Sequence, residues 1–134
     1  MKKLLILYLA CVLSLSACGE NTADAGEKTG YRQISQAEAA EMMQKDDGHV
    51  VLDVRRPDEF DAGHIPGAVC IPNETITDTR PEQLPDTDQI ILVYCRSGRR
   101  SKEAAQKLAG MGYKNVYEFG GIITWEGETE KVKQ

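Results

Sequence analysis

A seven-residue stretch carries the side chains of this sequence that are best suited to covalent chemistry. Cys95 is followed by residues 96–101, which read Arg-Ser-Gly-Arg-Arg-Ser. A cysteine thiolate is a strong nucleophile, and cationic neighbours together with a helix N-terminus stabilise its charge. Successive backbone N–H groups in a tight turn can bind an anion, and a glycine permits the backbone angles that such a turn requires. We therefore predict that Cys95 is a nucleophile whose anionic substrate is bound by Arg96, Ser97, Gly98, Arg99 and Arg100.

Cys70 and the two histidines indicate no second reactive centre. Cys70 lies in the apolar segment 68–71 and is predicted to be a core thiol, with a resolving partner for Cys95 as the alternative. For Cys95 the alternative is a buried structural thiol, which three arginines within five residues argue against. His49 and His64 show no metal-ligand spacing, so no metal or organic cofactor is predicted. His64 is expected to pin a loop by hydrogen bonds.

Two elements flank the Cys95 stretch and can hold it in place. Segments 50–54 and 90–94 are apolar at nearly every position, which indicates strands covered on both faces, as in a parallel sheet. Residues 101–111 predict an amphipathic helix, and Gly112 suits its left-handed cap. In open α/β sheets, ligands bind beyond the carboxyl ends of the strands, and Cys95 follows such an end.

Weaker patterns complete the predicted fold. A capping box from Ser35 to Glu38 opens a helix that is expected to run to about Lys45. Strands that alternate with helices predict an α/β domain with a mostly parallel sheet. Four shorter segments are further strands at 68–71 and 116–119, and short helices or turns at 57–62 and 76–84.

Five pieces of the sequence, taken in order, resemble the single-domain rhodanese family. They are Asp53-Val54-Arg55, Glu59-Phe60, the run from Gly63 to Ala68, the Cys95 stretch, and Gly120-Gly121 with Trp125. The resemblance implies a five-stranded, mostly parallel sheet with helices on both faces. It also implies a thiosulfate sulfurtransferase. Such an enzyme moves a sulfane sulfur from thiosulfate or a similar donor, through a persulfide on Cys95, to a thiophilic acceptor such as cyanide or a thiol.

The resemblance also implies roles for individual residues. It assigns substrate binding to residues 96–100, with Arg100 as the closing arginine, whose side chain is expected to turn under the loop. Asp53 and Arg55 flank the end of a buried strand, where an ion pair or loop anchor is favoured over direct substrate contact. Ser101 is expected to support the loop.

Three other functions are weighed against this one. Cysteine phosphatases and related arsenate reductases have five residues between their cysteine and arginine. Here four residues separate Cys95 from Arg100, and the tighter ring suits one sulfur atom better than a phosphate. A persulfide carrier that serves protein partners is not separated by the sequence from an enzyme acting on small molecules. A non-catalytic rhodanese-like interaction domain is disfavoured by the intact Cys95.

The N-terminal residues predict export. A positively charged start, an apolar stretch and small residues give residues 1–17 the layout of a secretory signal peptide. Leu15-Ser16-Ala17-Cys18 resembles the lipobox of bacterial lipoproteins, which implies a lipid on Cys18. An uncleaved anchor helix and an ordinary cleavage site are the alternatives. Gly19 rather than Asp follows Cys18, so the inner-membrane retention signal of Gram-negative lipoproteins is absent. We expect an exported protein on the periplasmic side, lipid-anchored to a membrane, which is the outer membrane in a Gram-negative cell.

The rest of the chain divides into a flexible lipid-anchored tether at 18–30, a rhodanese-like domain at 31–128 and a polar tail at 129–134. Removal of the signal peptide takes away two lysines and no acid, so the net charge changes from −5 to −7. This charge argues against nucleic-acid binding and against electrostatic attachment to anionic lipid, so membrane contact rests on the lipid anchor. The predicted partners are a small anionic sulfur donor and a thiol or cyanide acceptor.

Overall fold

The structure is a computed structural model that describes residues 30–133. The expected signal peptide, the lipidation site Cys18 and all of the tether except Gly30 lie outside the described residues. Across residues 30–133, no helix is long and apolar enough to span a membrane.

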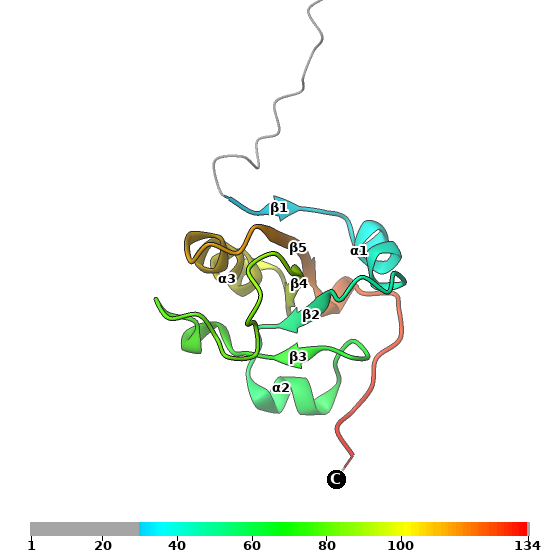
Figure 1. The fold of residues 1–134 in the computed structure, drawn as a ribbon. Coiled ribbons are helices and arrows are strands. Elements are labelled where there is room, and N and C mark those ends of the chain that lie inside the picture. Colours follow the sequence, from blue (N-terminus) through cyan, green and yellow to red (C-terminus); the bar gives the residue numbers. More distant parts are fainter. Residues whose placement is uncertain (1–29, 134) are drawn as a thin grey trace, which may run out of the picture.

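The two strongly apolar segments form adjacent strands at the centre of a five-stranded sheet (Figure 1). β2 (Val50–Asp53) pairs with β4 (Ile90–Cys95), and β4 pairs on its other side with β5 (Asn115–Gly121). Two short strands form the edges, with β1 (Arg32–Gln33) beside β5 and β3 (Val69–Cys70) beside β2. The order is β1-β5-β4-β2-β3 and every pair is parallel, which confirms the predicted parallel sheet.

Alternate side chains of β4 contribute to two separate cores. Ile91, Val93 and Cys95 belong to the cluster that includes the buried side of α3 (Arg99–Gly110). Leu92 and Tyr94 belong to the other cluster, which includes the buried side of α1 (Gln36–Met43). Because both faces of the strand are covered, every position is apolar, and the prediction of helices on both faces is confirmed. Cys95 therefore lies on the α3 side of the sheet.

The helix boundaries differ from the predicted ones by two residues. The capping box is present, with the Ser35 side chain accepting from the Glu38 N–H, but α1 ends at Met43 rather than near Lys45. α3 begins at Arg99 instead of Ser101, because Gly98 adopts a left-handed conformation with φ +111° that turns the chain directly into the helix. Arg99 and Arg100 therefore belong to the first helical turn and not to the loop.

Several shorter elements complete the structure. α2 (Pro57–Ala62) is a helix of six residues that Figure 1 shows beside β3, whereas residues 76–84 contain bends and a turn. The sequence analysis did not predict β1 or the two 3₁₀ turns, η1 (Asn73–Thr75) and η2 (Ile122–Thr124). A strand of two residues is too short to give a periodic pattern, which is why β1 was missed.

The C-terminal segment is held against the loop that follows α2. His64 and Glu130 exchange two backbone hydrogen bonds of 2.9 and 2.8 Å, and the Val132 N–H donates to the carbonyl of Asp61 at 3.2 Å. The imidazole of His64 stacks on Phe60 with ring centroids 3.7 Å apart. These contacts fasten residues 130–132 to α2 and to the loop after it.

Candidate active site

The sheet and α3 together determine where the Cys95 sulfur lies. Cys95 is the last residue of β4, and a register shift between Val93 and Cys95 brings Cys95 opposite Gly121 of β5. Residues 96–98 form the short connection to α3. Cys95 is 1% exposed. The sulfur thus lies buried beside the N-terminus of a twelve-residue helix, where the helix dipole favours negative charge.

Two groups of α3 and its cap contact the sulfur. The Gly98 N–H donates a hydrogen bond to the Cys95 Sγ at 3.0 Å, and the Ser101 Oγ lies 3.4 Å from the same sulfur. Helix N-termini, backbone N–H donors and cationic neighbours are the surroundings that favour a reactive thiolate in proteins. The geometry therefore suits a nucleophilic cysteine more than an inert core thiol.

The three arginines of the stretch have different surroundings. Arg100 donates from both terminal nitrogens to the Glu59 carboxylate of α2, at 3.1 and 3.3 Å, and its side chain is 18% exposed. Arg99 pairs with Glu103 at 3.2 Å on the outer surface, and its side chain is 78% exposed. Arg96 is exposed. The structure thus turns Arg100 toward α2, whereas the sequence analysis expected its side chain beneath the loop.

Asp53 and Arg55 form a buried ion pair at the end of β2. The Arg55 Nη2 donates to the Asp53 carboxylate at 2.7 Å and also to the carbonyl of Gly63 at 2.7 Å. The Tyr94 hydroxyl accepts a hydrogen bond from the Ile65 N–H at 3.1 Å, and burial together with a hydrogen bond to Asp53 raises the pKa of Tyr94. These contacts join the ends of β2 and β4 to the loop after α2.

The sequence analysis assigned no site role to two carboxylates, Glu118 and Glu59. Glu118 of β5 is 3% exposed; its Oε1 accepts from the Ser101 hydroxyl at 2.6 Å and from the Gly120 N–H at 2.8 Å. Glu59 is the partner of Arg100 described above. A single acid within the otherwise apolar strand segment 116–119 was the available signal for Glu118. For Glu59 the sequence carried no sign of which arginine it would meet.

The paired glycines of β5 hold the loop close to the sheet. The carbonyl of Arg96 accepts a hydrogen bond from the Ile123 N–H at 3.3 Å, and the Gln36 side chain of α1 donates to the carbonyl of Gly121 at 2.9 Å. A Cβ atom at Gly121 would overlap the Arg96 carbonyl group. Gly120 has φ +92°, a left-handed conformation that glycine adopts without strain.

Cys70 is chemically unlike Cys95. It is partly buried in the edge strand β3, and burial, followed by the charge of Asp53, raises the pKa of its thiol to about 11. A thiol with so high a pKa is neutral at physiological pH and is a poor nucleophile. Residues 30–133 contain no group of three His, Cys, Asp or Glu side chains that could hold a metal ion.

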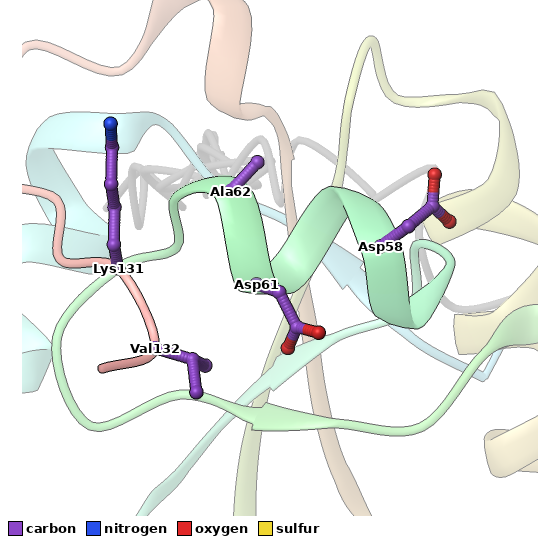
Figure 2. A pocket seen from close by; sticks show the side chains of 5 residues that line it. All are labelled: Asp58, Asp61, Ala62, Lys131 and Val132. Carbon is purple, nitrogen blue, oxygen red and sulfur yellow. The ribbon is translucent and has the colours of Figure 1, made fainter. Parts of the chain in front are cut away.

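One surface cavity lies away from the Cys95 loop. It has a volume of about 470 Å³, and Figure 2 shows its lining on α2 and on the C-terminal segment. The lining residues are Asp58, Asp61, Ala62, Lys131 and Val132. None of them belongs to the stretch from Cys95 to Ser101.

Comparison with known proteins gives a consistent result. The family described as the rhodanese-like domain matches residues 35–128. Thiosulfate sulfurtransferase GlpE of Pseudoalteromonas translucida (strain TAC 125) is 36% identical over 106 residues, which are 78% of this chain and 98% of the relative. A protein of Bacillus subtilis (strain 168), provisionally named sulfur carrier protein YrkF, is 35% identical over 99 residues, which are 73% of this chain and 52% of the relative.

A solved structure described as a rhodanese with anions from E. coli has a TM-score of 0.57 and 31% identity. It covers 62% of this chain and 98% of that one. The family match spans most of the chain, and the parallel sheet and the cysteine loop are both present. The chain belongs to the rhodanese-like domain family.

Proposed function

We propose that this protein is a sulfurtransferase that carries sulfane sulfur on Cys95, with thiosulfate or a similar small anion as the donor. One observation supports this proposal above the others. The Cys95 sulfur accepts a hydrogen bond from the Gly98 N–H at the N-terminus of α3, with Arg96, Arg99 and Arg100 in the same stretch. A buried sulfur with such donors suits an anionic thiolate or persulfide.

The sulfur transfer itself takes place at the Cys95 sulfur. The Cys95 thiolate attacks the outer sulfur of thiosulfate, a new S–S bond forms, and the S–S bond of thiosulfate breaks as sulfite leaves with the electron pair. The Gly98 N–H and the N-terminus of α3 are oriented in advance toward the negative charge on the sulfur, so little reorganisation is needed. Cyanide or a thiolate then attacks the outer sulfur of the persulfide and restores the Cys95 thiolate.

The relatives support this choice of substrate. The Pseudoalteromonas relative carries the name thiosulfate sulfurtransferase and matches over nearly its whole length. The E. coli rhodanese is described with anions, and thiosulfate and sulfite are both anions. A small anionic donor is therefore favoured.

Mass spectrometry of the intact protein and its peptides tests the proposal. Incubation with thiosulfate should add one sulfur atom, about 32 Da, to the peptide that contains Cys95, because the thiolate is the attacking species. Cyanide should remove that mass and release thiocyanate. Cys95→Ser should do neither, whereas Cys70→Ser serves as the matched control and should do both. Thiocyanate production by Cys95→Ser at the wild-type rate would exclude the mechanism.

A persulfide carrier for protein partners is the second candidate, because one relative is provisionally named a sulfur carrier protein. That relative is about twice as long as the matched region, since the match covers 52% of it. Steady-state turnover separates the two functions. An enzyme for small molecules completes many cycles with thiosulfate and cyanide, whereas a carrier loads sulfur once and releases it slowly unless a protein acceptor is supplied.

We also propose that the protein is exported and lipid-anchored through Cys18. The signal-peptide layout of residues 1–17 and the sequence Leu15-Ser16-Ala17-Cys18 support this location. A domain held on the periplasmic side would meet small anions that diffuse through the envelope. Cell fractionation of a tagged full-length chain should find it in the membrane fraction.

A further inference from the structure

The buried carboxylate of Glu118 is separated from the Cys95 sulfur by the hydroxyl group of Ser101. Val116 packs in the cluster on the α3 side of the sheet, whereas Tyr117 and Phe119 pack on the α1 side. Side chains alternate along a strand, so Glu118 projects to the same side as Val116 and Cys95. Its position beneath the first turn of α3 explains its contact with Ser101 of that turn.

The hydrogen bonds of Ser101 link the two groups. Its hydroxyl lies 2.6 Å from the Glu118 Oε1, 2.9 Å from the carbonyl oxygen of Gly98 and 3.4 Å from that of Gly120. The hydroxyl has one hydrogen, and the shortest of these distances is typical of donation to a carboxylate. The lone pairs of the Ser101 Oγ then accept from the Cys95 thiol at 3.4 Å. Two hydrogen bonds thus connect the Cys95 thiol through the Ser101 hydroxyl to the Glu118 carboxylate.

No cation among residues 30–133 forms an ion pair with Glu118. Among residues 30–133, no ion pair within 4.0 Å includes Glu118, and three arginines on the surrounding elements pair with other acids. Those pairs are Arg100 with Glu59, Arg99 with Glu103, and Arg55 with Asp53. Burial, and then the negative charge of Glu118, raise the pKa of Tyr31, which precedes β1. A Cys95 thiolate and an ionised Glu118 would face each other through the Ser101 hydroxyl, and like charges at such a distance repel each other.

We propose that Glu118 and Cys95 share one proton through Ser101, and that Glu118 accepts the proton of the Cys95 thiol when the thiolate forms. In this step the S–H bond of Cys95 breaks and its electron pair stays on sulfur. The proton passes to the Ser101 Oγ, while the hydroxyl hydrogen of Ser101 passes to the Glu118 Oε1. Nothing is oxidised or reduced, and the charge of the site does not change.

The inference rests on the proposed function, because the thiolate made in this way is the one that attacks the sulfur donor. It also explains how the Cys95 thiolate can attack an anionic donor although the Glu118 side chain lies nearby. Thiosulfate carries two negative charges, and an ionised Glu118 together with a thiolate would oppose its entry. With the proton on Glu118, the donor meets one anion instead of two, and the Ser101 hydroxyl is free to donate to the thiolate.

The pH dependence of Cys95 alkylation tests the shared proton without any sulfur donor. Full-length protein is treated with iodoacetamide across a pH series, and modification of the Cys95 peptide is followed by mass spectrometry. Two groups that share a proton lose their protons in two separate steps. The wild-type rate should therefore rise in two steps with a plateau between them. Glu118→Gln removes the second ionisable group, so its rate should rise in one step.

Two further variants test the route of the proton. The alkylation rate of Ser101→Ala should still rise in two steps with pH. Its rate on the plateau between the steps should be lower by about tenfold or more, the scale for loss of one hydrogen bond to a charged group. Ser101→Thr keeps the hydroxyl and should restore the plateau. Glu41→Gln, at an exposed position of α1, is the matched control and should behave as the wild type. Thermal melts show which variants are folded.

The outcomes decide between a proton partner and a structural anchor. A Glu118→Gln profile that superimposes on the wild-type profile would make Glu118 an anchor only and overturn the inference. If that variant does not fold, infrared spectroscopy of the wild type decides. Sulfur loading should strengthen a carboxylic-acid band, because the persulfide is anionic and leaves the proton on Glu118, and an unchanged band would again overturn it. A wild type that shows two alkylation steps but accepts no sulfur would remove the proposed function alone.

Discussion

Gly121 of β5 lies so close to the peptide after Cys95 that a Cβ atom at Gly121 would overlap the carbonyl group of Arg96 and come within 2.6 Å of the Ser97 Cα. Backbone atoms cannot move away from such an overlap as the end of a flexible side chain can. The absence of a side chain at Gly121 therefore sets how closely the loop after Cys95 approaches the sheet. This relationship explains why one of the paired glycines is needed at that position.

Gly121→Ala is expected to displace the loop. Overpacking typically costs about 1–3 kcal/mol of stability, and a shift of roughly 1 Å at a reacting group can reduce a rate by about a hundredfold. Turnover of thiosulfate and cyanide should therefore fall by a large factor, whereas the free energy of unfolding measured in urea should fall only moderately. Gly110→Ala is the control, because Gly110 is exposed at the end of α3 with nothing near its Cβ position. It should keep full activity, and equal losses in the two variants would contradict the close-approach explanation.

Arg100→Lys should lose much more activity than Arg99→Lys. The Arg100 guanidinium makes two hydrogen bonds to the Glu59 carboxylate, and lysine presents one compact charge that cannot reproduce this fork. The Arg99 pair with Glu103 is exposed, and such pairs contribute little. We expect a loss of about tenfold or more for Arg100→Lys, the scale for hydrogen bonds between charged groups. Turnover and melting temperature of both variants check this, and matching losses would mean that the Arg100 pair with Glu59 is not needed for activity.

Cys70→Ala should keep most of the sulfurtransferase activity. Removal of the thiol leaves a small void in β3, with an expected cost of about 1 kcal/mol, as for loss of one methyl-sized group. A steady-state assay beside a thermal melt measures both effects. Loss of activity with an unchanged melt would instead make Cys70 a redox partner.

The raised pKa of Cys70 also predicts a pH dependence of stability. Folding moves this pKa from 9.0 to about 11, so the folded state favours the protonated thiol. The resulting stabilisation is complete below pH 9 and is lost as the pH rises to about 11. Between these values the wild type should lose more stability than Cys70→Ala in urea unfolding. Parallel losses would show that Cys70 has the same pKa in both states.

Cys18→Ala should abolish lipid attachment. The motivating feature is Leu15-Ser16-Ala17-Cys18 after a short apolar stretch. Metabolic labelling of bacteria with a fatty acid analogue should mark the wild type and leave the variant unlabelled. Cys11→Ala is the matched control and should be labelled normally, because Cys11 lies within the expected signal peptide. Equal labelling of wild type and Cys18→Ala would exclude the lipid anchor.

The sequence determined the layers of this protein and the place of its candidate nucleophile. Segments 50–54 and 90–94 are apolar at almost every position, a pattern that indicates strands covered on both faces, and the structure confirms both as central parallel strands. A cysteine directly after such a strand, followed by glycine and arginines, then identified the loop. These are local patterns, so the order of residues along the chain is enough to read them.

Tertiary structure alone decided which side chains meet at the site. Glu118 follows Cys95 by 23 positions, and Glu59 precedes Arg100 by 41, so neither contact follows from local pattern. Glu118 reaches Ser101 because β5 lies beside β4 and its alternation turns that one acid toward α3. Glu59 meets Arg100 because α2 and α3 follow the carboxyl ends of the adjacent parallel strands β2 and β4. Contacts of this kind depend on strand order and register, which burial of the whole core selects, and no single segment contains that information.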